Sequence, residues 1–195
     1  NRAAAATIVA PVVITTDHTR RVALVAHEFA PKLGGMESVA RSLAENLRDR
    51  GVEVAVYTQR LLGSSALAYA RPLFRALPRP LRIDLWVDLL ATIDVALRDR
   101  PDVIHLCNAG LGPWIPALQA ALPCVVTANI HGNDLLAPWV NHGGMDDYAA
   151  AQRAGLSAAD AVVCVSRFSR AQALARGVDP RVLHVVENGI DPARF

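Results

Sequence analysis

The chain of 195 residues is 52% hydrophobic and 19% charged, with a formal net charge of +2. This length allows one domain with a sizeable core, and so small a charge gives no electrostatic basis for binding nucleic acid. No apolar run approaches the roughly 20 residues that a membrane-spanning helix needs.

The first 20 residues stand apart from the regular pattern that follows. The stretch from Ala3 to Ile14 is apolar, but it contains Pro11 and only Arg2 precedes it. It has some features of a weak signal-peptide core, and we favour a frayed N-terminal extension or an added edge strand. We therefore expect residues 21–195 to form the domain.

Short apolar segments alternate with amphipathic segments along nearly the whole chain. Strands are expected at Val22–Ala26, Glu53–Thr58, Val103–Leu106, Cys124–Ala128, Ala161–Val165 and Val182–Val186. Helices are expected at Met36–Arg50, Ile83–Arg98, Trp114–Ala121, Asp146–Ala159 and Arg167–Arg176. This alternation predicts an α/β fold, a parallel sheet with helices on both faces.

Gly34 and Gly35 lie between the first expected strand and the first expected helix. Glycines at such a turn let the backbone approach a ligand closely, and the helix N-terminus favours an anion such as phosphate. Taken alone, the glycine pair has another explanation, which is that it only forms the turn between the strand and the helix.

Polar or small residues also follow the other expected strands. They are Cys107, Asn108 and Gly110, the run Asn129 to Asp134, Ser166 with Arg167, and the run Glu187 to Asp191. Ligands of open parallel sheets bind beyond the carboxyl ends of the strands, so these residues predict a binding crevice there.

The three cysteines, Cys107, Cys124 and Cys164, are widely spaced and lie in or beside expected strands. An odd number with this spacing predicts reduced, buried thiols of a cytoplasmic protein rather than a disulfide framework or a zinc site. Since no two of the six histidines have ligand-like spacing, we expect no metal site.

The order and spacing of these motifs resemble the N-terminal half of a GT-B-fold glycosyltransferase of the retaining family 4. The matching motifs are Pro31–Glu37, Pro101–Leu106, Val125–Gly132, Ala159–Ser166 and Val185–Phe195. The resemblance implies that residues 21–195 form the Rossmann-like, acceptor-side domain of that fold. It also implies that the donor-binding domain is absent from this chain.

The resemblance implies transfer of a sugar from a nucleotide-sugar donor to an acceptor hydroxyl, with retention, without an obligatory metal and without a cofactor. It also implies that the present chain alone is inactive, because the main donor site is missing; the cysteines are the reason to expect a cytoplasmic enzyme. Two alternatives share the fold: a non-catalytic acceptor-binding half of a split enzyme, and a nucleotide-sugar epimerase.

The same resemblance assigns roles to residues. His131 matches a catalytically important histidine at the donor sugar, where it would stabilise charge as the sugar–phosphate bond breaks. Contacts with the donor phosphate are expected from Gly34, Gly35, Ser166 and Asn188. Independently of the resemblance, contacts with the acceptor are expected from Lys32, Glu37, Asn108, Asp134, Arg71 and Arg75.

Some of these residues have a plain structural alternative. Ser166 is also placed to cap the helix from Arg167, and Asp134 is equally suited to cap a turn. His105, which lies inside a strand, is expected to be a satisfied core or rim histidine.

No acidic residue stands between Glu53 and Asp84. The arginines in this segment are Arg60, Arg71, Arg75, Arg79 and Arg82. Solvated arginines on an amphipathic surface segment are one explanation. The other is an acceptor-side flap that meets a phosphorylated or lipid-linked acceptor, or an anionic membrane at its cytoplasmic face.

Overall fold

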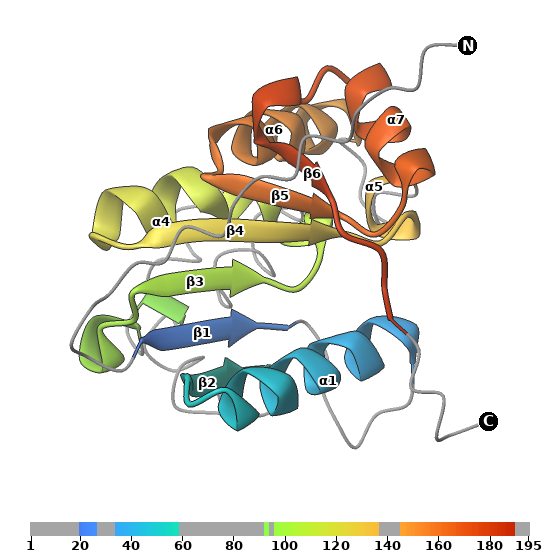
Figure 1. The fold of residues 1–195 in the computed structure, drawn as a ribbon. Helices are drawn as coiled ribbons and strands as arrows, with labels where there is room; N and C mark the ends of the chain where they lie inside the picture. Colours follow the sequence, from blue (N-terminus) through green and yellow to red (C-terminus); the bar gives the residue numbers. More distant parts are fainter. Residues whose placement is uncertain (1–19, 27–33, 59–91, 94–95, 137–144, 190–195) are drawn as a thin grey trace, which may run out of the picture.

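A computed structural model describes residues 20–26, 34–58, 92–93, 96–136 and 145–189. Six strands form one all-parallel sheet in the order β2-β1-β3-β4-β5-β6 (Figure 1). The strands are β1 (Arg21–Val25), β2 (Glu53–Tyr57), β3 (Val103–Leu106), β4 (Val125–Ile130), β5 (Ala161–Cys164) and β6 (Leu183–Val185). The predicted α/β, Rossmann-like parallel sheet is confirmed.

Helices connect the strands along both faces of this sheet. They are α1 (Gly35–Asp49), α4 (Ile115–Ala121), α5 (Asn133–Leu136), α6 (Met145–Ala158) and α7 (Arg167–Ala175), with short 3-10 helices η1 (Ala109–Trp114) and η2 (Pro180–Val182). The expected bounds agree with these to within two residues. The short elements η1, α5 and η2 were not predicted, because so few residues show no helical period.

Several predictions concern residues outside the described ranges. Of the expected helix Ile83–Arg98, only 92–93 and 96–98 are described, and they are helical. Residues 1–19, Lys32, Arg71 and Arg75 lie outside the described residues, together with the rest of the arginine-containing segment.

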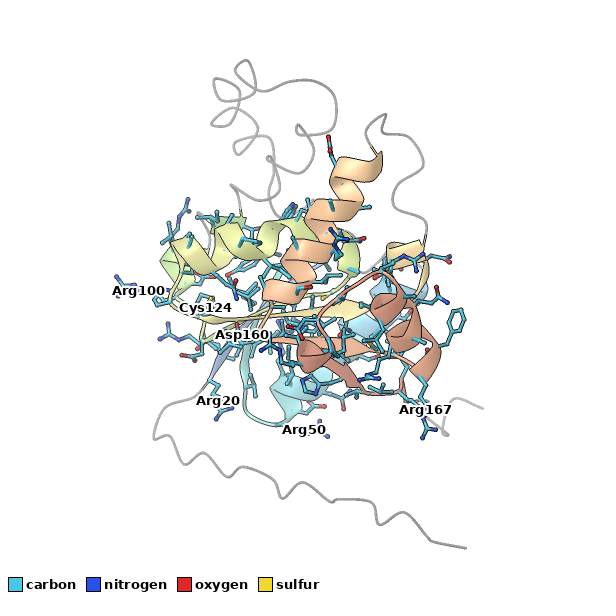
Figure 2. All side chains as sticks on the ribbon, turned by 90° about the horizontal axis from the view of Figure 1, so that it is seen from above. Arg20, Arg50, Arg100, Cys124, Asp160 and Arg167 are labelled. Atoms are coloured by element: carbon cyan, nitrogen blue, oxygen red, sulfur yellow. The ribbon has the colours of Figure 1, made fainter. Side chains whose placement is uncertain are left out.

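Side chains of a strand point alternately to the two faces of a sheet, and here each face has its own apolar cluster. Leu24, Val54 and Cys107 pack with Ala40 and Ala44 of α1. The larger cluster on the other face includes Ile104, Leu106, Val126 and Val162 of the strands, with Ile115, Leu118 and Leu156 of the covering helices. Figures 1 and 2 show α1 and α4 on opposite sides of the sheet.

Helix α6 packs against η1 through a contact between two backbones. A Cβ on Gly155 would lie 1.9 Å from the carbonyl oxygen of Gly112 and 2.7 Å from its carbonyl carbon. Next to this contact, Gln152 Nε2 donates a hydrogen bond to the carbonyl of Ala109 (2.9 Å) and Tyr148 donates one to the carbonyl of Gly110. The contact therefore fixes the segment that follows β3, at the carboxyl edge of the sheet.

We expect Gly155→Ala to lower the free energy of unfolding by about 1–3 kcal/mol or more, because the added methyl group meets backbone atoms that cannot move independently. Urea unfolding followed by circular dichroism measures this change. Gly35→Ala is the matched control, since a Cβ at Gly35 would have no neighbour within 4 Å. Equal stability of the two variants would contradict this account of the α6–η1 contact.

Candidate functional site at the carboxyl edge of the sheet

The strands are parallel, so the segments that follow them gather at one edge of the sheet (Figure 1). Gly34 and Gly35 at the start of α1, Asn108, His131 with Asp134, Ser166 and Asn188 all belong to these segments. Side-chain hydrogen bonds join two of the segments directly, the one after β3 and the one after β4.

The carboxylate of Asp134 organises both of these segments. Its Oδ1 accepts hydrogen bonds from the backbone N–H groups of His131 (3.0 Å) and Gly132 (2.8 Å). Its Oδ2 accepts one from the backbone N–H of Ala109 (2.8 Å). Gly132 has a φ of +124°, which L side chains rarely adopt, so the turn needs glycine there. Asp134 thus caps the turn, and its proposed contact with an acceptor stays a prediction.

His131 is held at a second point, on its ring. The ring Nε2 lies 3.0 Å from the carbonyl oxygen of Cys107. A carbonyl oxygen only accepts hydrogen bonds, so Nε2 must carry a proton and Nδ1 has the lone pair when the ring is neutral. The half-buried ring is therefore oriented by the segment after β3 and keeps one nitrogen for another partner.

Polar side chains occupy the α1-side face of the two central strands. His105 Nδ1 and Thr127 Oγ1 are hydrogen-bonded at 2.8 Å. His105 Nε2 and Asn129 Oδ1 are buried and have no hydrogen-bond partner among the described residues. An unpaired buried polar atom costs free energy, so each of them is a candidate contact for a ligand hydroxyl.

A ligand contact was not expected for His105, whereas Asn129 belongs to the polar run after the fourth strand that predicted the crevice. The signal was present in the sequence as polar residues at alternate strand positions, where a buried parallel strand is normally apolar. Burial, and then the nearby His131, lowers the pKa of His105 from 6.5 to about 4. The ring of His105 is accordingly neutral in the folded protein near pH 7.

The N-terminus of α1 holds a carboxylate of the protein itself. Gly34 is the N-cap residue, and a Cβ on it would lie 2.0 Å from Oε2 of Glu37. Glu37 is buried, and a negative charge in the first turn is favoured by the helix dipole. Gly35, by contrast, would meet nothing within 4 Å as alanine. A side chain at position 34 would therefore only displace the carboxyl end of Glu37, and the described packing leaves space for a ligand to approach at position 35.

The remaining predicted site residues are Ser166, Asn108 and Asn188. Ser166 caps α7, since its Oγ accepts a hydrogen bond from the backbone N–H of Ser169 (3.0 Å) and its own N–H donates to Ser169 Oγ (3.1 Å). Asn108 is buried at the start of η1, and Asn188 is exposed beyond β6. Ligand contacts of all three stay predictions.

Three further observations bear on the chemistry of the described residues. They contain no group of three or more His, Cys, Asp and Glu that could hold a metal ion. Burial raises the pKa of the Cys107 thiol to about 12, so this thiol is not a ready nucleophile. No helix among them is long and apolar enough to cross a membrane.

The parallel sheet, with polar loops at its carboxyl edge, defines this protein as a Rossmann-like α/β domain. The family model of Glycosyltransferase Family 4 matches residues 33–194, and the chain belongs to that family. A comparison with curated protein sequences finds no match.

Solved structures support the same fold. Sucrose-phosphate synthase from Thermosynechococcus elongatus is similar with a TM-score of 0.64 and 16% identity over 90% of this chain and 50% of that one. Anabaena HepE in complex with UDP-glucose has a TM-score of 0.53 and 16% identity, over 88% of this chain and 44% of HepE. The lipopolysaccharide outer core galactosyltransferase WaaB has a TM-score of 0.52 and 12% identity, over 87% and 46%. The chain spans about half the length of these proteins.

We expect Asp134→Ala to lower the free energy of unfolding by about 2–3 kcal/mol, because three backbone N–H groups lose a charged acceptor. Asp147→Ala, at an exposed position of α6, is the matched control. Denaturant unfolding measures both variants. If Asp134→Ala unfolds at the same denaturant concentration as the control, the carboxylate does not organise the two segments.

Because the folded-state pKa of His105 lies below that of the unfolded chain, the unfolded state binds more protons between pH about 4 and 6.5. The free energy of unfolding should therefore fall as the pH falls through this window, by up to about 1.4 kcal/mol per pH unit from this group. His105→Gln should flatten the profile relative to the parent protein. Parallel profiles of the two proteins, measured by urea unfolding, would contradict a neutral buried His105.

Proposed function

We propose that this chain is the acceptor-side domain of an enzyme that transfers a sugar from a nucleotide-sugar to an acceptor hydroxyl, with retention of anomeric configuration. The observation that carries the proposal is the orientation of His131 at the carboxyl edge by the carboxylate of Asp134 and the carbonyl of Cys107. Its family membership supports transferase chemistry. The complex of HepE with UDP-glucose supports a nucleotide-sugar as the donor.

In this proposal His131 acts at the donor sugar and its phosphate. Its Nε2–H is used by the carbonyl of Cys107, so Nδ1 is the ring nitrogen that remains for a bond with the substrates. The ring accepts a hydrogen bond from a sugar hydroxyl when neutral, and stabilises the leaving phosphate when protonated. Such fixed groups act most strongly on charge that develops in the transition state.

The start of α1 supplies the second part of the site. A Cβ on Gly35 would have no neighbour within 4 Å, so a ligand can approach the backbone here, and the amide group is suited to a phosphate oxygen. The Glu37 carboxylate beside Gly34 is suited to accept a hydrogen bond from a hydroxyl of the acceptor. A phosphate that approaches Gly35 must share the helix N-terminus with this carboxylate.

We propose the remaining steps of the reaction as the resemblance to the family implies them. The acceptor hydroxyl attacks from the side that the diphosphate leaves, the departing phosphate takes the proton of the hydroxyl, and no metal or cofactor is required. A second, donor-binding domain in the complete protein closes the site, and the present chain alone has no turnover. The cytoplasm is the proposed location.

The test is a transfer assay on a protein that contains both domains, with a panel of nucleotide-sugars that begins with UDP-glucose. His131→Gln should lower kcat by about 100-fold or more while the fold is retained. Gly35→Ala should raise the KM for the donor without loss of folding stability, because the fold does not need glycine at this position.

His184→Gln, a change of an exposed histidine on β6, is the control and should have full activity. A chelator in the assay should leave the rate unchanged. Full activity of His131→Gln, or the absence of transfer with every nucleotide-sugar, would reject the proposal. Conversion of the donor to its epimer without an acceptor would assign the domain to an epimerase instead.

A further inference from the structure

Gln152 of α6 makes two hydrogen bonds with one side-chain nitrogen. Its Nε2 donates to the backbone carbonyl of Ala109 (2.9 Å) and to that of Asp134 (2.9 Å). An amide –NH2 group has two hydrogens, so both are used. Because both partners are carbonyl oxygens, which only accept, the nitrogen of the amide and not its oxygen must face them. Gln152 thus joins α6 both to the segment after β3 and to the segment after β4.

Gln152, Ala109 and Asp134 form a closed set of hydrogen bonds. Ala109 accepts from Gln152 with its carbonyl, and its own N–H donates to Oδ2 of Asp134 (2.8 Å). Asp134 accepts from Gln152 with its carbonyl and from Ala109 with its carboxylate. Since each pair is joined directly, a shift of any one of the three residues bends or breaks its bonds to the other two.

This set lies next to both anchors of His131. One anchor is the carboxylate of Asp134, which accepts a hydrogen bond from the backbone N–H of His131 (3.0 Å). The other is the carbonyl of Cys107, which accepts one from the ring Nε2 (3.0 Å). Cys107 comes shortly before Ala109 in the segment that Gln152 binds. Gln152 is therefore connected to the first anchor through the backbone of Asp134 and to the second through the backbone of Ala109.

These groups are enclosed by the domain itself. Gln152 is 3% exposed and Ala109 is fully buried, so their hydrogen bond does not depend on what contacts the surface of the domain in a longer protein. A buried carbonyl that loses its donor is costly, because water cannot take the place of the donor. Methionine at position 152 would have nearly the same length as glutamine and no donor, so it would leave both carbonyls without this partner.

We propose that Gln152 is a positioning residue for His131 in the transfer reaction. It holds the Cys107 carbonyl and the Asp134 carboxylate in one relative position, so that the ring keeps a single orientation with Nδ1 available to the substrates. A reacting group must be held closely in its productive geometry, since a small displacement slows the reaction strongly. The effect of Gln152 on catalysis rests on the proposed function, whereas its effect on the His131 ring is a property of the fold alone.

The first experiment observes the ring of His131 by NMR in the complete protein with isotope-labelled histidine, as the parent and as Gln152→Met. At pH about 8 an ordinary histidine ring is neutral. The hydrogen bond to the Cys107 carbonyl then slows exchange of the Nε2–H proton with water, and loss of this signal in His131→Gln assigns it. We expect the exchange to be about tenfold or more faster in Gln152→Met, because the bond opens more often.

Gln119→Met is the matched control. Gln119 of α4 also donates from Nε2 to a carbonyl of α6, that of Ala158 at the other end of the helix (2.9 Å). The control therefore makes the same chemical change away from the candidate site, and the His131 signal should exchange as in the parent. Gln152→Asn is a milder second variant, in case Gln152→Met does not fold. It keeps two donors on a side chain one carbon shorter, and it should speed up the exchange in the same direction.

Kinetics test the consequence for catalysis. In the transfer assay Gln152→Met should lower kcat about tenfold or more and change the KM for the donor by about twofold at most, because His131 is proposed to act on charge that develops in the transition state. Gln119→Met should have the kcat and KM of the parent. A purely structural role of Gln152 would lower the urea concentration at the unfolding midpoint without this difference between kcat and KM.

The proposal is overturned if the His131 signal exchanges in Gln152→Met, or in Gln152→Asn where that variant replaces it, as it does in the parent. It is overturned as well if the variant has the kcat of the parent, or if Gln119→Met reproduces its losses. Absence of transfer by the parent with every nucleotide-sugar would instead reject the proposed function. In that case the exchange of the His131 signal would still decide whether Gln152 positions the ring.

Discussion

The structure of the candidate site depends on one carboxylate. Asp134 accepts backbone hydrogen bonds from the segment that follows β4 and from the segment that follows β3, so a single side chain links the two segments beyond the paired strands. The ring of His131 adds a second bond between the same segments. Helix α6 packs against the segment that follows β3, through the contact of Gly155 with Gly112. These interactions leave the backbone around His131 little freedom, which suits the catalytic role that we propose for this residue.

The strands and longer helices were predictable because each has a clear pattern of apolar residues. The details of the site were less predictable from the sequence. Asp134 was recognised as a turn cap or a ligand contact, but its bond to Ala109 joins residues 25 positions apart and leaves no local pattern. The fold of Glu37 back onto Gly34 depends on a side-chain conformation, which composition and spacing do not determine. For His105 and Asn129 a local sign did exist, as polar residues at alternate positions of buried strands.

Two negatively charged groups, the Glu37 carboxylate and a phosphate of the donor, would compete for the N-terminus of α1. A helix N-terminus attracts one negative charge strongly, and here the Glu37 carboxylate already lies beside Gly34. A phosphate group at Gly35 would repel that carboxylate unless a proton or a hydroxyl lies between them. In the proposed reaction the acceptor hydroxyl has this role, so the start of α1 would favour the two substrates together over the donor alone.

The order of strands has a consequence for how the two parts of the sheet respond to a ligand. After β1 the chain turns toward β2, whereas after β3 it proceeds toward β4, β5 and β6. The direction of winding therefore reverses between β1 and β3, and a crevice opens at such a reversal. A ligand in this crevice would contact α1 on one side and the Cys107 and His131 segments on the other. Its binding energy would stabilise the association of both parts of the sheet, and thermal unfolding would report occupancy.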